Sequence, residues 1–186
     1  MSSRKKKILF IVSNLKIGGG AENYVSLLSK GVSSFYDVEI LTYYKFKEEY
    51  SINCKRFNFN YKYSNNFLVK VFRLLVVFPF LTHRFLKKKK YDYIVSNAED
   101  ANVVTLLNKI LYRSNKNSKY CAIIHNNLDL GVYKHTQFLH KKADVLFTVS
   151  NSLTQLYIKK FNSKNIFTLY NPFDFKEIED LKKEKI

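Results

Sequence analysis

A glycine loop between an apolar run and an amphipathic stretch constrains this fold more than any other feature. Residues 8–12 read ILFIV, three glycines stand at 18–20, and Ala21-Glu22 open a stretch with apolar residues at helical spacing as far as Val32. This order predicts a buried strand, a tight loop and a helix. Glycine permits positive φ and close approach of another molecule, and a helix N-terminus attracts anions. We therefore expect a phosphate site at the start of a parallel α/β sheet.

The glycine loop completes neither of the common nucleotide-binding motifs. A dinucleotide fingerprint has the pattern G-x-G-x-x-G, and its third glycine position is occupied here by Asn23. The next expected strand runs into Thr42-Tyr43-Tyr44 and not into a ribose-binding carboxylate, and no G-K-[S/T] follows the loop. NAD and P-loop sites are therefore disfavoured, and a loop that only turns the chain tightly remains an alternative.

Composition limits the class of protein and its partners. The 186 residues suffice for one domain, and a hydrophobic content of 46% is typical of a globular chain. The 32 Lys and Arg against 15 Asp and Glu give a net charge of +17, which favours phosphorylated substrates, anionic lipid or nucleic acid. Cys54 and Cys121 lack metal-ligand spacing and suggest buried thiols in a reducing compartment. We expect a cytoplasmic protein, with a peripheral place at the inner face of the membrane left open.

Strands and helices should alternate along most of the chain. We expect strands at 8–12, 38–44, 91–95, 120–124, 143–149 and 166–170, a short strand within 54–61, and helices at 21–34, 67–86, 100–112, 136–142 and 151–161. Such alternation predicts an α/β class, namely a Rossmann-like, doubly wound, mostly parallel sheet with helices on both faces.

Polar and small residues follow the carboxyl ends of the expected strands. Besides the glycine loop, these are Asn97 to Asp100, His125-Asn126, Ser150-Asn151 and Asn171. Ligands bind beyond the carboxyl ends of the strands in such sheets, and these ends meet at one edge. We therefore expect one site at that edge, with His125 as its strongest candidate because it ends a buried strand beside other polar residues.

Other polar residues have simpler interpretations, which we prefer. Glu22 would be a first-turn acid that favours the helix dipole, and Ser152 would be a helix N-cap. For Ser150, a capping role stays open beside a role in the site. We expect the remaining histidines at the surface, namely His83, His135 and His140.

The most apolar stretch, 67–86, leaves two interpretations open. Cations interrupt it, Pro79 should bend or end it, and four lysines follow at 87–90. A membrane-spanning helix is disfavoured because it requires a long run with few charges. The segment Phe67–Lys90 is either an amphipathic helix on an anionic membrane surface, with the lysines near the headgroups, or a helix packed on the sheet and followed by a solvated lysine loop.

Four ordered segments resemble the N-terminal domain of retaining glycosyltransferases of the GT-B fold, family 4. They are Ile17-Gly18-Gly19-Gly20-Ala21-Glu22 after the first strand, the strand ending in His125-Asn126, the stretch ADVLFTVS at 143–150 before a helix, and Leu169-Tyr170-Asn171-Pro172-Phe173-Asp174. Each match is modest alone, but the ordered set is specific and covers nearly the whole chain.

The resemblance implies an acceptor-binding domain that faces a nucleotide-sugar-binding domain across a cleft. Such enzymes move a sugar from a nucleotide sugar, here expected to be a UDP-sugar, to an acceptor hydroxyl with retained configuration and typically without a metal or other cofactor. The N-terminal domain would span 1–174, and 175–186 would begin the interdomain linker. The sequence does not contain the donor-binding domain, so we expect the chain to be inactive alone and to need that domain or a partner chain.

The resemblance also assigns roles at the cleft. His125 would be the catalytic residue beside the reacting sugar. The residues expected to bind substrate or phosphate are Gly18, Gly19, Gly20, Glu99, Asp100, Asn126, Ser150 and Asn171; for Glu99 and Asp100 the only basis is their place after a strand.

The expected acceptor is a membrane-lipid-linked glycan, a lipopolysaccharide or a polysaccharide. Two other functions stay open: a non-catalytic interaction module that binds a partner transferase, and a basic nucleic-acid-binding protein. Nucleic acid is the less favoured partner, because the sequence has no zinc-finger, RNP or helix-turn-helix pattern and its lysines are mostly scattered.

Overall fold

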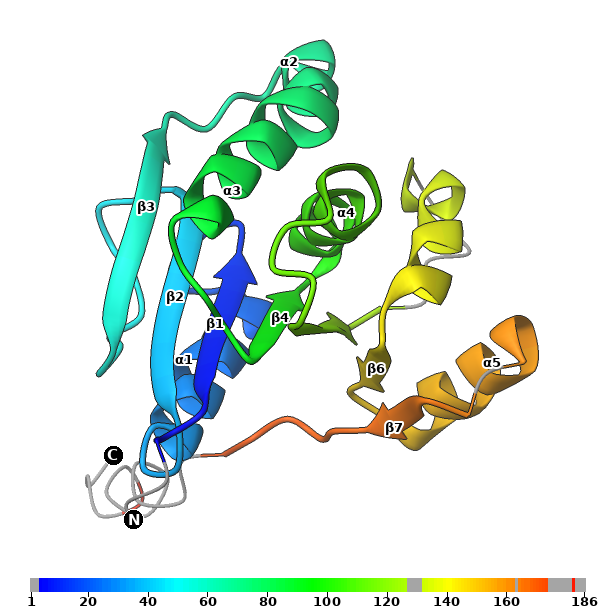
Figure 1. Cartoon of the computed structure of the whole chain (residues 1–186). Helices are drawn as coiled ribbons and strands as arrows, with labels where there is room; N and C mark the ends of the chain where they lie inside the picture. The colour runs from blue at the N-terminus through cyan, green and yellow to red at the C-terminus, as the bar shows by residue number, and fades with distance from the viewer. Residues whose placement is uncertain (1–3, 127–131, 163, 174–181, 183–186) are drawn as a thin grey trace.

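One parallel sheet of seven strands forms the centre of the molecule. The computed structural model describes residues 4–126, 132–162, 164–173 and 182, so Asp174 and nearly all of the expected linker at 175–186 lie outside the described residues. The strand order is β3-β2-β1-β4-β5-β6-β7 (Figure 1). The strands are β1 (Lys7–Val12), β2 (Asp37–Tyr44), β3 (Lys55–Tyr61), β4 (Tyr93–Asn97), β5 (Lys119–Ile124), β6 (Val145–Thr148) and β7 (Ile166–Thr168).

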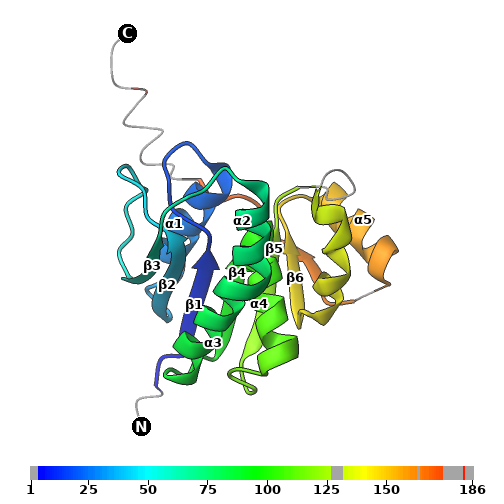
Figure 2. The ribbon, with the colours of Figure 1, turned by 90° about the horizontal axis from the view of Figure 1, so that it is seen from above.

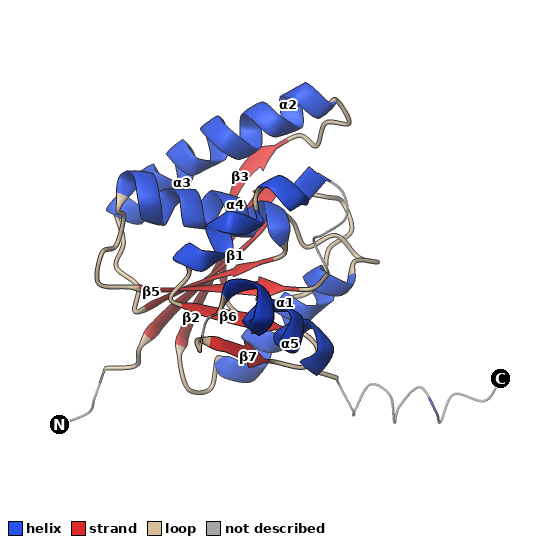
Figure 3. Ribbon diagram, turned by 90° about the vertical axis from the view of Figure 1, so that its right-hand side faces the viewer, coloured by secondary structure: helices blue, strands red, loops and turns tan. Residues whose placement is uncertain are grey.

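Helices cover both faces of this sheet, which confirms the doubly wound α/β fold. Figures 2 and 3 show α2, α3 and α4 on one side of the sheet and α1 on the other. The core contacts place α5 on the side of α3 and α4, because it packs on Ala122 and Leu146, which alternation puts on the same face as Tyr120. The helical elements are α1 (Gly20–Val32), α2 (Phe67–Phe72), the π-helical turn η1 (Arg73–Val77), α3 (Phe78–Lys87), α4 (Glu99–Leu107), the π-helical turn η2 (Asn108–Tyr112), the 3-10 helices η3 (Val132–His135) and η4 (Gln137–Lys142), and α5 (Asn151–Phe161).

The two-residue period of the central strand distributes its side chains between two cores. Leu9 and Ile11 of β1 join the cluster under α3 and α4, whereas Ile8, Phe10 and Val12 join the cluster under α1. A strand buried on both faces must be apolar on both, which explains the uninterrupted apolar run at its position in the sequence. The last two strands, β6 and β7, are shorter than the expected 143–149 and 166–170.

The segment 67–87 forms one continuous helical rod of α2, η1 and α3. Of the two effects expected of Pro79, it does not end the helix, because the wide turn η1 precedes it and Pro79 falls in the first turn of α3, where a missing N–H is tolerated. The rod packs on the sheet through buried Phe78 and Leu86, so the sheet-packed interpretation holds for this side. No helix among the described residues combines the length and the apolarity needed to cross a bilayer.

A buried carboxylate ties the lysine run to the amino edge of the sheet. Glu39 on β2 lies 3.0 Å from Lys7 Nζ and 2.9 Å from Lys89 Nζ, and it accepts a hydrogen bond of 2.6 Å from the Tyr91 hydroxyl. Burial raises the pKa of this carboxyl, but the hydrogen bonds from Tyr91, Lys89 and Lys7 outweigh burial, so the pKa lies below its ordinary value. Lys89 is therefore a structural residue. The sheet-packed interpretation of 67–90 had expected it in a solvated lysine loop, and for Lys89 that part is wrong.

Neutralising Glu39 should destabilise the fold. Glu39→Gln leaves two largely buried ammonium groups without their carboxylate, so we expect the free energy of unfolding in urea to fall by about 2 kcal/mol at neutral pH. Asp37→Asn is the matched control, because its side chain is 57% exposed and its carboxylate lies 3.6 Å from the same Lys7. The control should lose less than about 0.5 kcal/mol. Equal losses in the two variants would contradict a special role for Glu39.

Candidate functional site

The glycine loop at the end of β1 is held by the connection between β2 and β3. Gly18 has φ of +99°, and its N–H donates to the Tyr50 hydroxyl at 3.2 Å. The backbone N–H of Ile17 donates to the Glu48 carbonyl at 3.3 Å, and the N–H of Tyr50 donates to the Leu15 carbonyl at 2.8 Å. The loop is thus bound on one side to segment 48–50, and the Gly18 N–H is already engaged.

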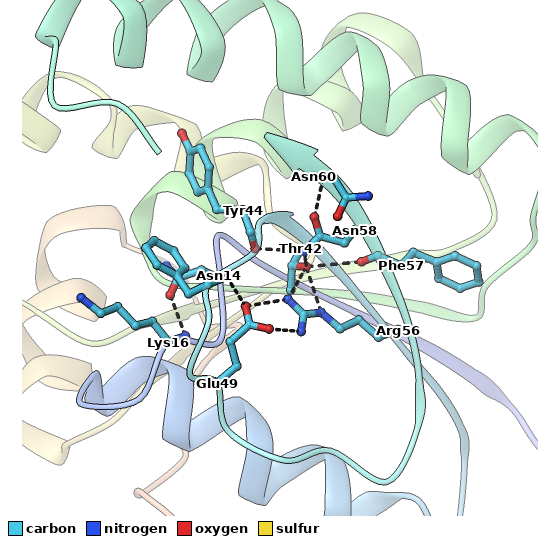
Figure 4. Close-up of polar contacts among 10 residues, drawn as sticks. Asn14, Lys16, Thr42, Tyr44, Glu49, Arg56, Phe57, Asn58 and Asn60 are labelled. Carbon is cyan, nitrogen blue, oxygen red and sulfur yellow. Dashed lines mark hydrogen bonds and ion pairs between the residues drawn. The ribbon is translucent and has the colours of Figure 1, made fainter. Parts of the chain in front are cut away.

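A polar network fixes that connecting segment, as Figure 4 shows. Arg56 of β3 makes a bidentate pair with Glu49, at 2.6 and 3.0 Å, and its Nε donates to Thr42 Oγ1 at 3.1 Å. The hydrogen bond from Arg56 is the main reason that the pKa of Glu49 lies below its ordinary value. Asn58 donates to the Tyr44 carbonyl at 3.0 Å. Because these bonds join β2, β3 and their connection, the loop has a firm support.

The N-terminus of α1 already carries a carboxylate. A Cβ added at Gly19 would lie 1.9 Å from Glu22 Oε2, so the Glu22 side chain is folded back over Gly19. This position suits a first-turn acid at the positive end of the helix dipole, the role that we preferred for Glu22. Gly20 has open space where a Cβ would stand. Phosphate binding by Gly18, Gly19 and Gly20 stays a prediction, and it requires the Glu22 carboxylate to move aside.

His125 is held at the carboxyl edge by residues from two neighbouring elements, β4 and α1. Its Nε2 lies 2.9 Å from Asn97 Oδ1, and Asn97 Nδ2 donates to the Ala21 carbonyl at 2.9 Å. Since Nδ2 must be the donor toward Ala21, Oδ1 faces the imidazole and can only accept, so Nε2 carries the proton. The Tyr24 ring meets the imidazole edge to face, with ring centroids 5.0 Å apart. We call Tyr24, Asn97 and His125 the histidine cluster.

The histidine cluster favours a neutral imidazole that accepts a hydrogen bond through Nδ1. Burial lowers the pKa of His125 to about 4, so the ring is uncharged at neutral pH. Among the described residues, none donates to Nδ1. Ala98, next to Asn97, has φ of 66° and ψ of 165°, a conformation that costs a residue with Cβ about 1–3 kcal/mol. Such strain beside a fixed imidazole is typical of functional sites.

An aromatic cavity lies beside the glycine loop. Its volume is about 470 Å³, and it opens between the end of β2, the rod, the first turn of α4 and η3. Its lining residues include Tyr43, Tyr44, Tyr63, Phe67, Lys70, Val71, Leu74, Leu75, Phe78, Asp100, Tyr133, His135 and Thr136. Tyr63 also lines an open groove of about 560 Å³ along Gly18 and Gly19, so the two hollows adjoin. We use the name aromatic cavity for the first of them.

Asp100 is the carboxylate of the aromatic cavity. The Tyr133 hydroxyl donates to its Oδ1 at 2.6 Å. Burial raises the pKa of Asp100 above its ordinary value, although the bond from Tyr133 opposes this shift. A carboxylate within an apolar, aromatic lining is suited to accept hydrogen bonds from a ligand hydroxyl.

Glu99 lies beside Asp100 but faces the interior of the protein. Its carboxylate is 3.2 Å from His140 Nε2 and accepts a hydrogen bond of 3.1 Å from Thr136 Oγ1. His140 is only 1% exposed, so its expected surface position is wrong. Glu99 and Asp100 together hold the η3–η4 segment against α4, and only Asp100 lines the cavity.

The remaining expected site residues lie at the same edge with fewer contacts. Ser150 is the N-cap of α5 and accepts a hydrogen bond from the Leu153 N–H at 3.3 Å, so the cap is Ser150 and not Ser152. Asn126 and Asn171 are exposed and lie two and three residues beyond Ile124 and Thr168, the last residues of β5 and β7. Site roles for these residues remain predictions.

Sequence reasoning missed the tyrosines of the site, among them Tyr24 and Tyr133. Tyr24 counted only as an apolar position of α1, yet its ring contacts His125 and its hydroxyl donates to the Leu169 carbonyl at 3.3 Å. Tyr133 lies in no stretch with a helical or strand pattern of apolar residues, so the sequence did not single it out. The one available signal was the high aromatic content of 16%, which does not indicate which aromatic side chains lie together in the fold.

Comparison with known proteins yields one family and a consistent set of folds. The model of Glycosyltransferase Family 4 matches residues 18–177. The apo form of the lipopolysaccharide outer core galactosyltransferase WaaB matches with a TM-score of 0.65 and 17% identity over 90% of this chain. The catalytic domain of starch synthase IV from Arabidopsis thaliana, bound to ADP and acarbose, gives 0.66 and 14% over 94%. HepE from Anabaena, in complex with UDP-glucose, gives 0.53 and 17% over 96%.

The chain spans about half the length of these structures, namely 46%, 53% and 49%. At sequence identities of 14% to 17%, the similarity to these structures shows a shared fold and nothing more. No curated protein sequence matches the chain. The family and the GT-B resemblance that the sequence motifs indicated are confirmed by the family match and these folds.

Protonation of His125 should destabilise the folded chain in mild acid. The pKa of histidine is about 6.5 in an unfolded chain and about 4 here, so the unfolded state binds more protons between these values. Stability is therefore complete above pH 6.5 and declines as the pH falls toward 4. Allowing for partial exposure, the wild type should lose about 1 to 2 kcal/mol more than His125→Gln between about pH 7.5 and about pH 5. Urea titrations at both pH values measure this difference.

The control is His135→Gln, at an exposed histidine, which should show the same dependence of stability on pH as the wild type. If His125→Gln also shows the wild-type dependence of stability on pH, His125 is not the group responsible.

The backbone of the glycine loop should tolerate a side chain least at Gly18. Gly18→Ala forces a residue with Cβ into positive φ, so we expect a loss of about 1 kcal/mol in thermal or urea unfolding. Gly31→Ala in α1 is the control, because that position also has open space but lies in a helix without positive φ. The control should be neutral or stabilising by up to about 1 kcal/mol. The same sign of change in both variants would mean that the Gly18 conformation is not required.

Proposed function

The chain belongs to glycosyltransferase family 4, and from this membership we propose that it is the acceptor-side domain of an enzyme that moves a sugar from a nucleotide sugar to an acceptor hydroxyl. The observation that carries this proposal is the histidine cluster, in which Asn97 fixes a neutral His125 beside the start of α1. The cluster and the glycine loop lie at the carboxyl edge of the sheet, where open α/β folds bind ligands.

The proposed donor is a UDP-sugar bound mainly by a second domain. HepE is known in complex with UDP-glucose, and starch synthase IV with ADP and acarbose, which supports a nucleotide sugar as the donor class. Since this chain spans about half of such structures, residues 1–174 are the acceptor-side domain in our proposal and 175–186 begin the linker. The donor-binding domain belongs to a longer form of this polypeptide or to a partner chain, and residues 1–186 alone are inactive.

In the closed enzyme, His125 acts on the reacting sugar through Nδ1. Its Nε2–H is occupied by Asn97, so Nδ1 accepts a hydrogen bond from a hydroxyl of the transferred sugar and positions it. A neutral ring suits this role, because a protonated Nδ1 could only donate. Gly18 to Gly20 let the donor phosphate approach the backbone, while Asn126, Ser150 and Asn171 complete the edge of the cleft.

The aromatic cavity is the proposed site of the acceptor. Tyrosine rings stack on the apolar faces of sugar rings, and Asp100 accepts a hydrogen bond from an acceptor hydroxyl. The apolar lining from the rod, including Phe67, Val71 and Leu75, suits an acceptor that carries a lipid. We favour a membrane-lipid-linked glycan over a free polysaccharide for this reason. Membership in the family also favours the transferase over the interaction module and over nucleic-acid binding.

Replacing His125 in the assembled enzyme should reduce turnover far more than nucleotide binding. The tagged protein is purified from its own cells together with the donor-binding domain, whether that domain is part of the same polypeptide or a separate chain. The assay measures transfer of labelled sugar from UDP-glucose, UDP-galactose or UDP-N-acetylglucosamine to lipid or polymer. We expect His125→Ala to lower kcat by about 100-fold, because it removes an interaction with the transition state. Binding of UDP by calorimetry should change little.

The matched control is His83→Ala, since His83 stacks on Tyr112 and bonds to Ser114 outside the site. This variant should keep wild-type turnover. Wild-type turnover in His125→Ala would remove His125 from the reaction. Transfer by residues 1–186 alone would disprove the need for a second domain, and no transfer by any purified assembly would favour the interaction module.

A further inference from the structure

The helical rod exposes an apolar ridge that no described element covers. Leu68 is 74% exposed, Phe72 58%, Val76 51% and Phe80 48%. These four side chains recur every four residues. A spacing of four drifts around an α-helix of about 3.6 residues per turn, but the wide turn η1 takes more residues per turn and offsets the drift. The ridge is thus a continuous apolar line along the outer side of the rod.

The inner side of the same rod is fixed to the protein. Phe78 and Leu86 are buried in the core under α3, and Asn108 donates to the Pro79 carbonyl at 2.7 Å. Figure 3 shows α2 and α3 as the outermost helices on their side of the sheet, with their axis along the surface of the molecule. The ridge therefore faces outward along its whole length, and a flat surface can contact all of it at once.

Charges at both ends of the ridge are of one sign. Segment 51–90 contains no acidic residue. Past Phe80, the cations Arg84 and Lys88 follow at the same sequence spacing, and the Arg84 guanidinium lies 5.9 Å from the Phe80 ring centroid. Lys87 and Lys90 are exposed beside them. At the other end, Lys70 bonds to the Tyr63 hydroxyl and Arg73 to the Lys62 carbonyl, which keeps two more cations beside α2.

We propose that this surface, the ridge with its flanking cations, binds the surface of an anionic lipid bilayer with the rod lying in the interface. An apolar line between cationic ends fits acyl chains below and anionic headgroups around it. A second copy of this chain fits poorly, because it would bring cationic ends together in a protein of net charge +17. Lys89 and Arg56 take no part, since they are paired with Glu39 and Glu49.

The ridge adjoins the aromatic cavity. Phe67, Val71 and Leu75 belong to the same helical segment as the ridge and line the cavity. A lipid-linked acceptor held in the bilayer would therefore reach the cavity along the rod. This last step rests on the proposed function, whereas binding of the bilayer by the ridge does not.

The test is flotation of the 186-residue chain with vesicles of phosphatidylcholine alone and of phosphatidylcholine mixed with phosphatidylglycerol. No donor, acceptor or second domain is needed, so failure here is distinct from failure of the sugar-transfer assay. We expect binding to the mixed vesicles only, and weaker binding at high salt. Equal binding to both vesicle types, or none to either, would overturn the proposal.

Two variants separate the apolar and the electrostatic contributions. The ridge variant, Leu68→Ser with Phe72→Ser, should bind the mixed vesicles at least about tenfold more weakly. Its control is Leu156→Ser with Ile158→Ser on α5, where both side chains are 37% exposed, and it should bind like the wild type. Circular dichroism and melting temperatures verify that each variant is folded.

The charge variant is Lys87→Gln, Lys88→Gln and Lys90→Gln. It should bind about tenfold more weakly at low salt and differ little from the wild type at high salt. Its control removes three exposed lysines elsewhere, Lys116, Lys119 and Lys159, each changed to glutamine. If the variant and the control lose vesicle binding equally, the effect comes from net charge alone, and the proposal is overturned. A dimer by light scattering that the ridge variant abolishes, without vesicle binding by the wild type, would assign the ridge to a second copy instead.

Discussion

All seven strands end at one edge of the sheet, because every adjacent pair is parallel. The register places Val12 beside Asn97 and Asn97 beside Ile123, so the segments that follow β1, β4 and β5 emerge side by side. This alignment is what allows Asn97 to reach both the Ala21 carbonyl and the His125 ring. A slip of one residue in β4 would turn Asn97 to the opposite face and separate the histidine cluster. The site thus depends on strand register before it depends on any side chain.

The two edges of the sheet carry different tasks. At the amino edge, Glu39 joins Lys7, Lys89 and Tyr91 in a largely buried network that ties the end of the rod to β1 and β2. At the carboxyl edge, Ala98 and Gly18 have positive φ, and His125 is buried with a lowered pKa. Each of these features costs stability, so selection for stability alone would not favour them. Separate edges let the fold hold costly geometry where ligands bind while the opposite edge stabilises the sheet.

The rod of α2, η1 and α3 connects three surfaces that sequence position alone would not associate. One side closes the core through Phe78 and Leu86, one flank lines the aromatic cavity, and the outer side is the apolar ridge. The wide turn η1 is central to this arrangement, because it accommodates Pro79 without a break and keeps the exposed apolar residues in line. A single helix of this kind can link attachment at a surface to the position of an acceptor.

Local pattern determined the alternation of strands and helices, the doubly wound α/β fold, and the presence of Gly18, His125 and Ser150 at strand ends. Periodicity and chain order encode these features within windows of a few residues. The sequence could not show that Tyr24 would pack on His125, that Glu99 would turn inward to His140 while Asp100 lines a cavity, or that Tyr43, Tyr63 and Tyr133 would converge. Those contacts join residues from different elements of the chain. Only the packing of helices on a registered sheet fixes which side chains meet, because each contact depends on the position of elements that no local sequence window contains.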